Sequence, residues 1–176
     1  MNLHFWRCNA ALLLAVTAVA CSPSLNWREV SLNGMVALLP CKPDHAERVL
    51  QLGAIQVPLR MSGCEASGAL YAISHVQVPD VSQLQAVHQD WRQATLAAMQ
   101  ATAAPMQLSK PPATPAGQTK MRLRPEEFDG KRPDGSAVQA QLLWLAKGKD
   151  IYQIAVYGSK LQPEMTELLF SELSLR

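Results

Sequence analysis

The 176-residue sequence predicts an α+β domain, with helices packed on an antiparallel sheet of about six strands. Three observations support this fold class. Segments of alternating polarity lie on both sides of one helical stripe, a second helix lies near the end of the chain, and the turns between neighbouring strands have hairpin length. The expected order is three strands, a helix, three strands and a helix, within a single domain over 27–176.

The first half of this domain predicts three strands and a helix. Residues 27–39 alternate around a turn at Asn33-Gly34, and a polar loop is expected at 41–47. The segments 49–60 and 68–78 predict two antiparallel strands, joined through 63–67. Asp80 then caps a helix that reaches about residue 100, and Gln83 stands where a capping box places it. The apolar stripe of this helix comprises Val81, Leu84, Val87, Trp91, Ala94 and Ala98.

Residues 101–117 form a connector rich in proline. Proline lacks the backbone N–H that regular pairing needs, so no strand or helix is expected there. A connector of about 17 residues is long for a compact domain, which makes it a candidate binding loop. The alternative is a tolerated insertion, since lengthening a surface loop adds little closure entropy.

The second half predicts strands at 120–128, 137–147 and 151–157. The turn Arg132-Pro133-Asp134-Gly135 is a strong hairpin signal, and 147–150 is the second turn. The last helix begins near Gln162, with Pro163 at its first position, where the missing N–H has no helical acceptor. Its inner stripe comprises Met165, Leu168 and Leu169.

The first 20 residues have the pattern of a cleavable export signal. Arg7 precedes an apolar run from Ala10 to Ala20. This run of about eleven residues is much shorter than the roughly 20 that a membrane-spanning helix needs, but it suits the apolar region of a signal peptide. We therefore expect residues 1–20 to be removed on export.

The end of the signal, Ala18-Val19-Ala20-Cys21, has two interpretations. It fits a general signal peptidase cutting after Ala20, and it resembles the lipobox of bacterial lipoproteins, with Ala18 in place of the usual Leu. Lipid on Cys21 would leave Cys41 and Cys64 as an even set in an oxidising compartment, whereas an unmodified Cys21 would leave an odd thiol. We therefore predict lipidation of Cys21, with residues 21–26 as a lipidated tether.

The predicted location is the bacterial envelope. Ser22 resembles the lipoprotein class sorted to the outer membrane, so we expect a lipid anchor there, with the domain facing the periplasm.

We expect Cys41 and Cys64 to form a disulfide. The loop of 24 residues that it closes predicts a stabilisation of about 3.5 kcal/mol. The alternative is two buried thiols, and a metal site is not expected, since neither cysteine belongs to a C-x-x-C motif or has a histidine at ligand spacing.

The charge of the chain gives no reason to expect a nucleic-acid partner. The full sequence has 16 basic and 14 acidic residues, and loss of Arg7 with the signal brings it closer to neutrality. One basic cluster is interleaved with acidic residues, and we interpret it as a solvated strand face. It comprises Lys120, Arg122, Arg124, Lys131 and Arg132.

No histidine in the sequence stands in a recognisable catalytic motif. Asp44-His45 lies in the predicted polar loop, without a nucleophile signal nearby. His88 and Asp90 are two residues apart on the predicted helix and so point to different faces. His75 is expected to be a half-buried polar residue of a strand. Trp27, Trp91 and Trp144 would form either an aromatic binding patch or, as we predict, part of the core.

Three stretches of the C-terminal third resemble the PsbP-like α/β/α sandwich group. They are Pro133-Asp134-Gly135 with the strand that ends at Trp144–Gly148, then Asp150–Gly158, then Leu169–Leu175. The group includes an extrinsic photosystem II subunit, a Ran-binding import factor and DcrB-like bacterial lipoproteins. The stretches 39–44 and 61–66 resemble small uncharacterised proteobacterial lipoproteins.

The resemblance implies a PsbP-like domain over 27–176 and carries no catalytic or cofactor residues, because the group shares a shape rather than an activity. Its members mostly bind other proteins. The expectation is a non-enzymatic envelope lipoprotein, without a cofactor, that binds or helps to assemble an unidentified envelope protein. The alternative is a small periplasmic enzyme or ligand carrier with a pocket near the 101–117 connector.

Overall fold

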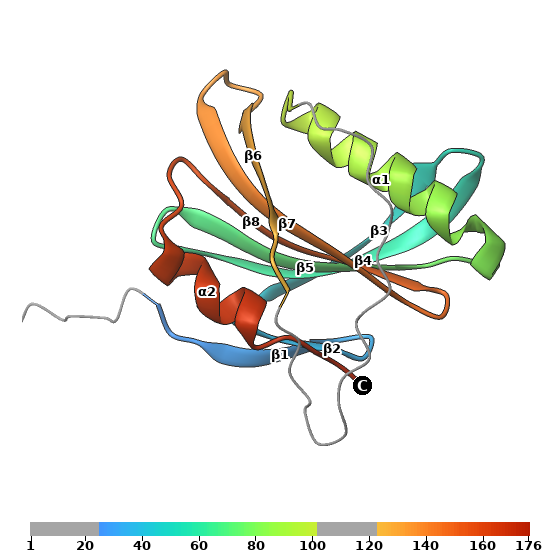
Figure 1. The fold of residues 1–176 in the computed structure, drawn as a ribbon, viewed down its shortest axis with the longest axis horizontal. Coiled ribbons are helices and arrows are strands. Elements are labelled where there is room, and N and C mark those ends of the chain that lie inside the picture. Colours follow the sequence, from blue (N-terminus) through green and yellow to red (C-terminus); the bar gives the residue numbers. More distant parts are fainter. Residues whose placement is uncertain (1–24, 102–122) are drawn as a thin grey trace, which may run out of the picture.

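The computed structural model describes residues 25–101 and 123–176 and shows an α+β fold with two antiparallel sheets (Figure 1). The larger sheet has the strand order β3-β4-β5-β8-β7-β6, and the smaller has the order β1-β2-β9. The larger sheet comprises β3 (Asp44–Leu52), β4 (Ile55–Ala66), β5 (Ala69–Gln77), β6 (Glu126–Lys131), β7 (Ala137–Lys147) and β8 (Asp150–Gly158). The other elements are β1 (Arg28–Leu32), β2 (Met35–Leu39), β9 (Ser174–Leu175), the short 3-10 helix η1 (Val81–Gln83), α1 (Leu84–Ala98) and α2 (Pro163–Ser171). The predicted fold class and the six-stranded antiparallel sheet are confirmed.

Both faces of the larger sheet are covered (Figure 1). Helix α1 lies across one face, and α2 lies with β1 and β2 on the other. Successive residues of β8 divide between the two faces, as the period of a strand requires. Tyr152, Ile154 and Val156 pack toward the smaller sheet, whereas Ile151 and Ala155 pack toward α1.

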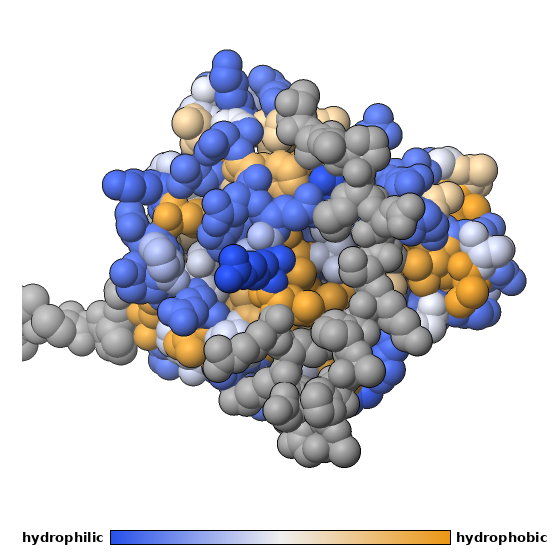
Figure 2. Space-filling view, in the orientation of Figure 1, coloured by the Kyte–Doolittle hydropathy of each residue, from blue (hydrophilic) through white to orange (hydrophobic). Residues whose placement is uncertain are grey.

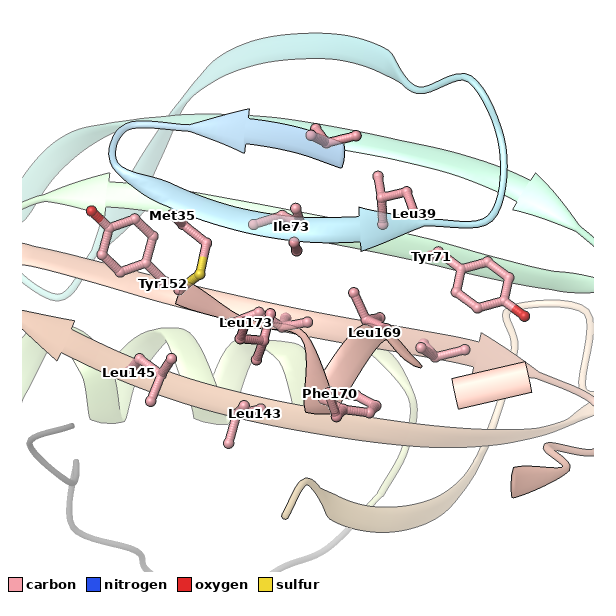
Figure 3. Close-up of a cluster of buried hydrophobic side chains, with 14 of the residues drawn as sticks. Met35, Leu39, Tyr71, Ile73, Leu143, Leu145, Tyr152, Leu169, Phe170 and Leu173 are labelled. Carbon is pink, nitrogen blue, oxygen red and sulfur yellow. The ribbon is translucent and has the colours of Figure 1, made fainter. Parts of the chain in front are cut away.

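The core beneath the smaller sheet is the largest apolar cluster (Figure 3). Its fully buried members come from β2, β5, β7, β8, α2 and the segment after α2, so it joins distant parts of the chain. They include Met35, Leu39, Tyr71, Ile73, Leu145, Tyr152, Ile154, Leu169 and Leu173. Burial of a side chain of this size contributes about 1.5–3 kcal/mol, so this cluster is a main source of stability.

The free edge of the larger sheet differs from the prediction. The polar loop expected at 41–47 becomes strand at Asp44, and the strand expected at 49–60 is broken by a two-residue turn at Gly53-Ala54. β3 is an edge strand that is exposed along most of its length, so its side chains have no polar–apolar alternation to detect.

The prediction of a connection at 63–67 is also wrong, because β4 continues to Ala66. The turn into β5 consists of Ser67 and Gly68, whose φ angles are 49° and 74°. Positive φ at both positions is what a type I′ hairpin requires. The Asn33-Gly34 turn between β1 and β2 has the same character and was predicted correctly. Along the described part of the chain, five strands, not three, therefore precede the first helix.

The helical stripe of α1 is less apolar than predicted. Asp80 accepts a hydrogen bond from the Ser82 amide at 2.8 Å, as expected of a cap, but Gln83 forms no side-chain capping bond. The buried residues of α1 are Val87, His88, Trp91, Arg92 and Leu96. Ala94 and Ala98, which the apolar pattern placed on the inner stripe, are exposed. Two polar residues thus occupy the buried side of this helix.

The last part of the chain follows the prediction closely, with three differences. β7 has the expected bounds, and α2 begins at Pro163. The strand expected at 120–128 is observed from Glu126, after Pro125, while 120–122 lie outside the described residues. On α2 the buried residues are Thr166, Leu169 and Phe170, whereas Leu168 is 40% exposed. Ser174 and Leu175 pair with β2 as a ninth strand, which the sequence did not predict.

Candidate functional site

The predicted disulfide is present in the structure. Cys41 follows β2 and Cys64 lies within β4, and their Cα atoms are 5.9 Å apart, inside the range for an unstrained bridge. The bond therefore joins the segment after the smaller sheet to the larger sheet. Cys21, the residue predicted to carry lipid, and the whole signal 1–20 lie outside the described residues, so lipidation stays a prediction.

His45 contacts a serine that sequence analysis did not connect to it. His45 Nδ1 lies 2.8 Å from Ser62 Oγ, because β3 and β4 pair His45 directly with Ser62. A histidine beside a serine hydroxyl is half of a nucleophilic arrangement. However, Ser62 is fully buried, and Asp44 precedes His45 on a strand and so points to the opposite face. The pair therefore lacks both an accessible nucleophile and an orienting carboxylate from Asp44.

His75 is fully buried, not half-buried as predicted. Its Nε2 lies 2.7 Å from Asp150 Oδ1, and the Gln77 side-chain amide donates to the same oxygen at 3.1 Å. The ring also stacks at a tilt on Tyr152, with centroids 5.0 Å apart. Its position between β5 and β8 is fixed on several sides, which suits a structural role for this histidine–carboxylate pair.

His88 occupies the most unusual polar position under α1. The side chain is fully buried, and neither ring nitrogen has a hydrogen-bond partner among the described residues. Its ring meets the ring of Trp144 edge to face at 5.1 Å, and Trp91 meets the same tryptophan at 4.9 Å. Burial, followed by the positive charge of Arg92, lowers the pKa of His88 from 6.5 to about 4. His88 is therefore a neutral imidazole at pH 7.

Arg92 extends this polar layer one helical turn further along α1. Its Nη2 donates to Glu126 Oε2 on β6 at 2.8 Å, and its guanidinium lies 5.7 Å from the centroid of the Phe128 ring. One turn later, Thr95 Oγ1 accepts a hydrogen bond from the Gln153 side-chain amide at 3.2 Å. These residues tie α1 to β6 and β8. As predicted, His88 does not combine with Asp90, and Trp91 and Trp144 belong to the core under α1. On the other face of the sheet, Trp27 is partly buried and packs against Tyr71 of the apolar cluster under the smaller sheet.

A concavity of about 410 Å³ lies on β6 and β7 beside Leu161. Two exposed carboxylates, Glu127 and Asp129, line it, and each accepts a hydrogen bond from a glutamine of β7. The two donors are Gln139 and Gln141, and Gln139 also accepts the backbone N–H of Leu161 at 3.0 Å. Hydrophilic residues gather over β6 and β7 on the face in Figure 2. The concavity presents negative charge and amide groups on rigid strands.

The predicted basic cluster is only partly within the described residues. Lys120 and Arg122 lie outside them, as do residues 102–117 of the predicted connector. Arg132 donates to the Ala137 carbonyl at 2.9 Å and so stabilises the hairpin turn, while Arg124 and Lys131 are exposed. Within 25–101 and 123–176, no group of three or more histidine, cysteine or acidic side chains is placed to hold a metal ion.

Across the same described residues, no helix combines the length and the apolar character that crossing a membrane requires. No protein-family model, no curated protein and no solved structure matches this chain. The function must therefore be argued from the chain itself.

Proposed function

We propose that this chain is a lipid-anchored protein of the bacterial envelope, with a domain that acts by binding another envelope protein. The supporting observation is the Cys41–Cys64 disulfide. Removal of the signal takes Cys8 away, and the disulfide uses two of the three cysteines that remain. Cys21 is then the single unpaired cysteine, directly after the small residues at which lipoprotein signals are cut. Structural disulfides persist in oxidising compartments, which agrees with export.

The acidic concavity supports binding as the mode of action. Glu127 and Asp129 are held by glutamine amides on paired strands, so the two carboxylates are oriented before any partner arrives. An arginine or lysine side chain of a partner protein fits the charge and the size of such a concavity. The connector 101–117 remains a predicted part of the contact surface.

We also propose that the domain is PsbP-like. An antiparallel sheet with a helix on each face supports this assignment, as do the hairpin at Gly135 and the α2 segment that carry the sequence resemblance. The assignment implies an architecture and a tendency to bind proteins, and it implies no reaction.

The anchor is tested by labelling cells with an alkyne fatty acid. Cys21→Ser removes the only thiol that the proposal allows to be acylated, so labelling of the protein should disappear and the protein should leave the membrane fraction. Cys8→Ser is the matched control, because Cys8 belongs to the removed signal. Equal labelling of Cys21→Ser and the wild type would contradict the anchor.

Binding is tested by crosslinking in intact envelopes and recovery through a C-terminal tag. Glu127→Lys/Asp129→Lys should abolish recovery of a specific partner. Glu164→Lys/Glu167→Lys, which makes the same charge change on exposed positions of α2, should leave recovery intact. Unchanged recovery with the first variant would exclude the concavity. A parallel variant with a Gly-Ser link in place of 101–117 tests the connector, and absence of any specific crosslinked protein would contradict the binding function.

A further inference from the structure

Strand β3 is a free edge of the larger sheet. It lies at one end of the strand order, and among the described residues it pairs only with β4. The six residues from Asp44 to Val49 are all exposed, and Val49 is 67% exposed. Because successive side chains of a strand point to opposite faces, exposure of six in a row means that neither face of this stretch is covered by the described residues. A regular strand in this position can accept a further strand.

The register of the hairpin shows which backbone groups are available at this edge. A two-residue turn makes Leu52 and Ile55 the closing hydrogen-bonded pair. Hydrogen-bonded and non-hydrogen-bonded pairs then alternate along β3, so the odd-numbered residues direct their N–H and C=O groups away from β4. Val49 lies opposite Pro58, which has no N–H to donate, in agreement with this phase. His45, Glu47, Val49 and Gln51 therefore present their backbone groups outward.

The side chains of β3 are complementary in charge to the same strand reversed. The relevant segment is Asp44-His45-Ala46-Glu47-Arg48. Antiparallel pairing of this segment with a second copy, centred on Ala46, sets Asp44 opposite Arg48 and His45 opposite Glu47. In this register the outward-directed residues His45 and Glu47 face each other, as an antiparallel ladder requires. We propose that β3 binds β3 of a second copy of this chain about Ala46, so that the two sheets become continuous.

The same charges disfavour the neighbouring registers. Pairing centred on Glu47 sets two glutamates opposite each other, and pairing centred on Arg48 sets two arginines opposite each other, which destabilises a strand pair. Pairing centred on Val49 avoids like charges but forms no ion pair across the interface. Charges on an edge strand normally hinder pairing, but here their order selects one register.

Contacts within one copy leave the required groups available. Glu47 is held by Arg60 at 3.0 Å, and His45 uses Nδ1 for Ser62, which leaves Nε2 for the second copy. Among the described residues, neither Asp44 nor Arg48 forms an ion pair. All these side chains are exposed, so the association should be weak and should weaken further as salt screens the pairs.

The test uses the mature chain with Cys21→Ser in sedimentation velocity over a range of concentrations. A reversible dimer that salt weakens is expected. Arg48→Asp and Asp44→Arg each set like charges opposite each other, which should weaken self-association at least about tenfold. Mixed together, the two variants restore both ion pairs, so the mixture should form a heterodimer that neither variant forms alone. Arg28→Asp, the same charge change at an exposed position of β1, is the control and should dimerise like the wild type.

Each result decides the proposal. A wild type that stays monomeric at every concentration overturns it. A dimer that persists in both single variants, or a mixture that remains monomeric, rules out the register about Ala46 and overturns it as well. Circular dichroism of each variant checks folding, which these exposed positions should not disturb. The proposal stands whether or not Cys21 carries lipid.

Discussion

The two faces of the larger sheet are built differently. The face beneath β1, β2 and α2 is filled by a continuous apolar cluster and is linked to the segment after β2 by the disulfide. The face beneath α1 has two smaller apolar clusters, and the polar side chains of His88, Arg92 and Gln153 are buried on the same face. The first face also buries His75, on the side of β5 that carries Tyr71 and Ile73, but Asp150 holds that ring. In contrast, neither ring nitrogen of His88 has a partner among the described residues. The first face should therefore respond mainly to lost volume, and the second to the loss of individual polar partners and, through His88, to pH.

Phe170→Ala should have the largest effect on stability. Phe170 is 4% exposed and belongs to the apolar cluster under the smaller sheet. Truncation removes apolar contacts and leaves a cavity, so the free energy of unfolding should fall by about 4 kcal/mol. Urea unfolding followed by circular dichroism measures it. Leu168→Ala, on the exposed side of the same helix, is the control, and an equal loss there would show that the cost of truncation does not depend on burial in this core.

Removal of the disulfide should come next. Cys41→Ala/Cys64→Ala opens the loop of 24 residues in the unfolded chain, and the stability should fall by about 3.5 kcal/mol. Chemical denaturation of the variant, compared with the wild type before and after reduction, measures the change. The reduced wild type should unfold like the variant. A bridge that contributes less than about 1 kcal/mol would mean that the two sheets hold together without it, and the contrast between the faces would then rest on packing alone.

The pattern of correct and incorrect sequence predictions follows burial. The side chains of β7 and β8 alternate in polarity or are apolar throughout, because both faces of these strands are covered. Their bounds were therefore predicted to within one residue. β3 could not be found in the same way, because an edge strand in solvent has no apolar face. β9 has only two residues, and its pairing with β2 depends on a contact between the two ends of the domain.

The candidate site shows the same limit more sharply. Cysteine parity predicted the Cys41–Cys64 bond, because the rule depends on a count rather than on position. The prediction of the buried side of α1 was wrong, because apolar periodicity assigns only apolar residues to the buried stripe. It therefore left out His88 and Arg92, which are buried. The contact between His45 and Ser62 depends on strand register, which was lost once 41–47 was interpreted as a loop.

His88 should make stability depend on pH through the α1 face. Its pKa is lowered to about 4 in the fold and is 6.5 as a free group, so the unfolded chain binds a proton first as the pH falls. The free energy of unfolding is therefore not reduced by this group above about pH 6.5, and it falls progressively as the pH is lowered to 4. Between pH 7 and pH 5 the wild type should lose about 2 kcal/mol through this one group.

His88→Phe isolates that contribution. The phenyl ring keeps the edge-to-face contact with Trp144 and has no nitrogen to protonate or leave without a partner. The variant should be as stable as the wild type or more stable at pH 7, and its unfolding free energy should fall by about 2 kcal/mol less between pH 7 and pH 5. Parallel pH profiles for His88→Phe and the wild type would mean that α1 opens to solvent before His88 is protonated.

The smallest effect should be the coupling between Arg92 and Glu126. Their side chains are 8% and 28% exposed, so each single change, Arg92→Met or Glu126→Met, leaves a charge poorly solvated, while the double change leaves none. A double-mutant cycle in urea should give a coupling of about 1 kcal/mol.

The matched control pair is Arg60 and Glu47, whose side chains are 43% and 56% exposed. The coupling between Arg60 and Glu47 should be about 0.3 kcal/mol, because water screens both charges. It is measured at high dilution, where the proposed β3 dimer dissociates. Equal couplings would show that α1 does not shield its polar layer, and the difference between the two faces would then reduce to packing volume.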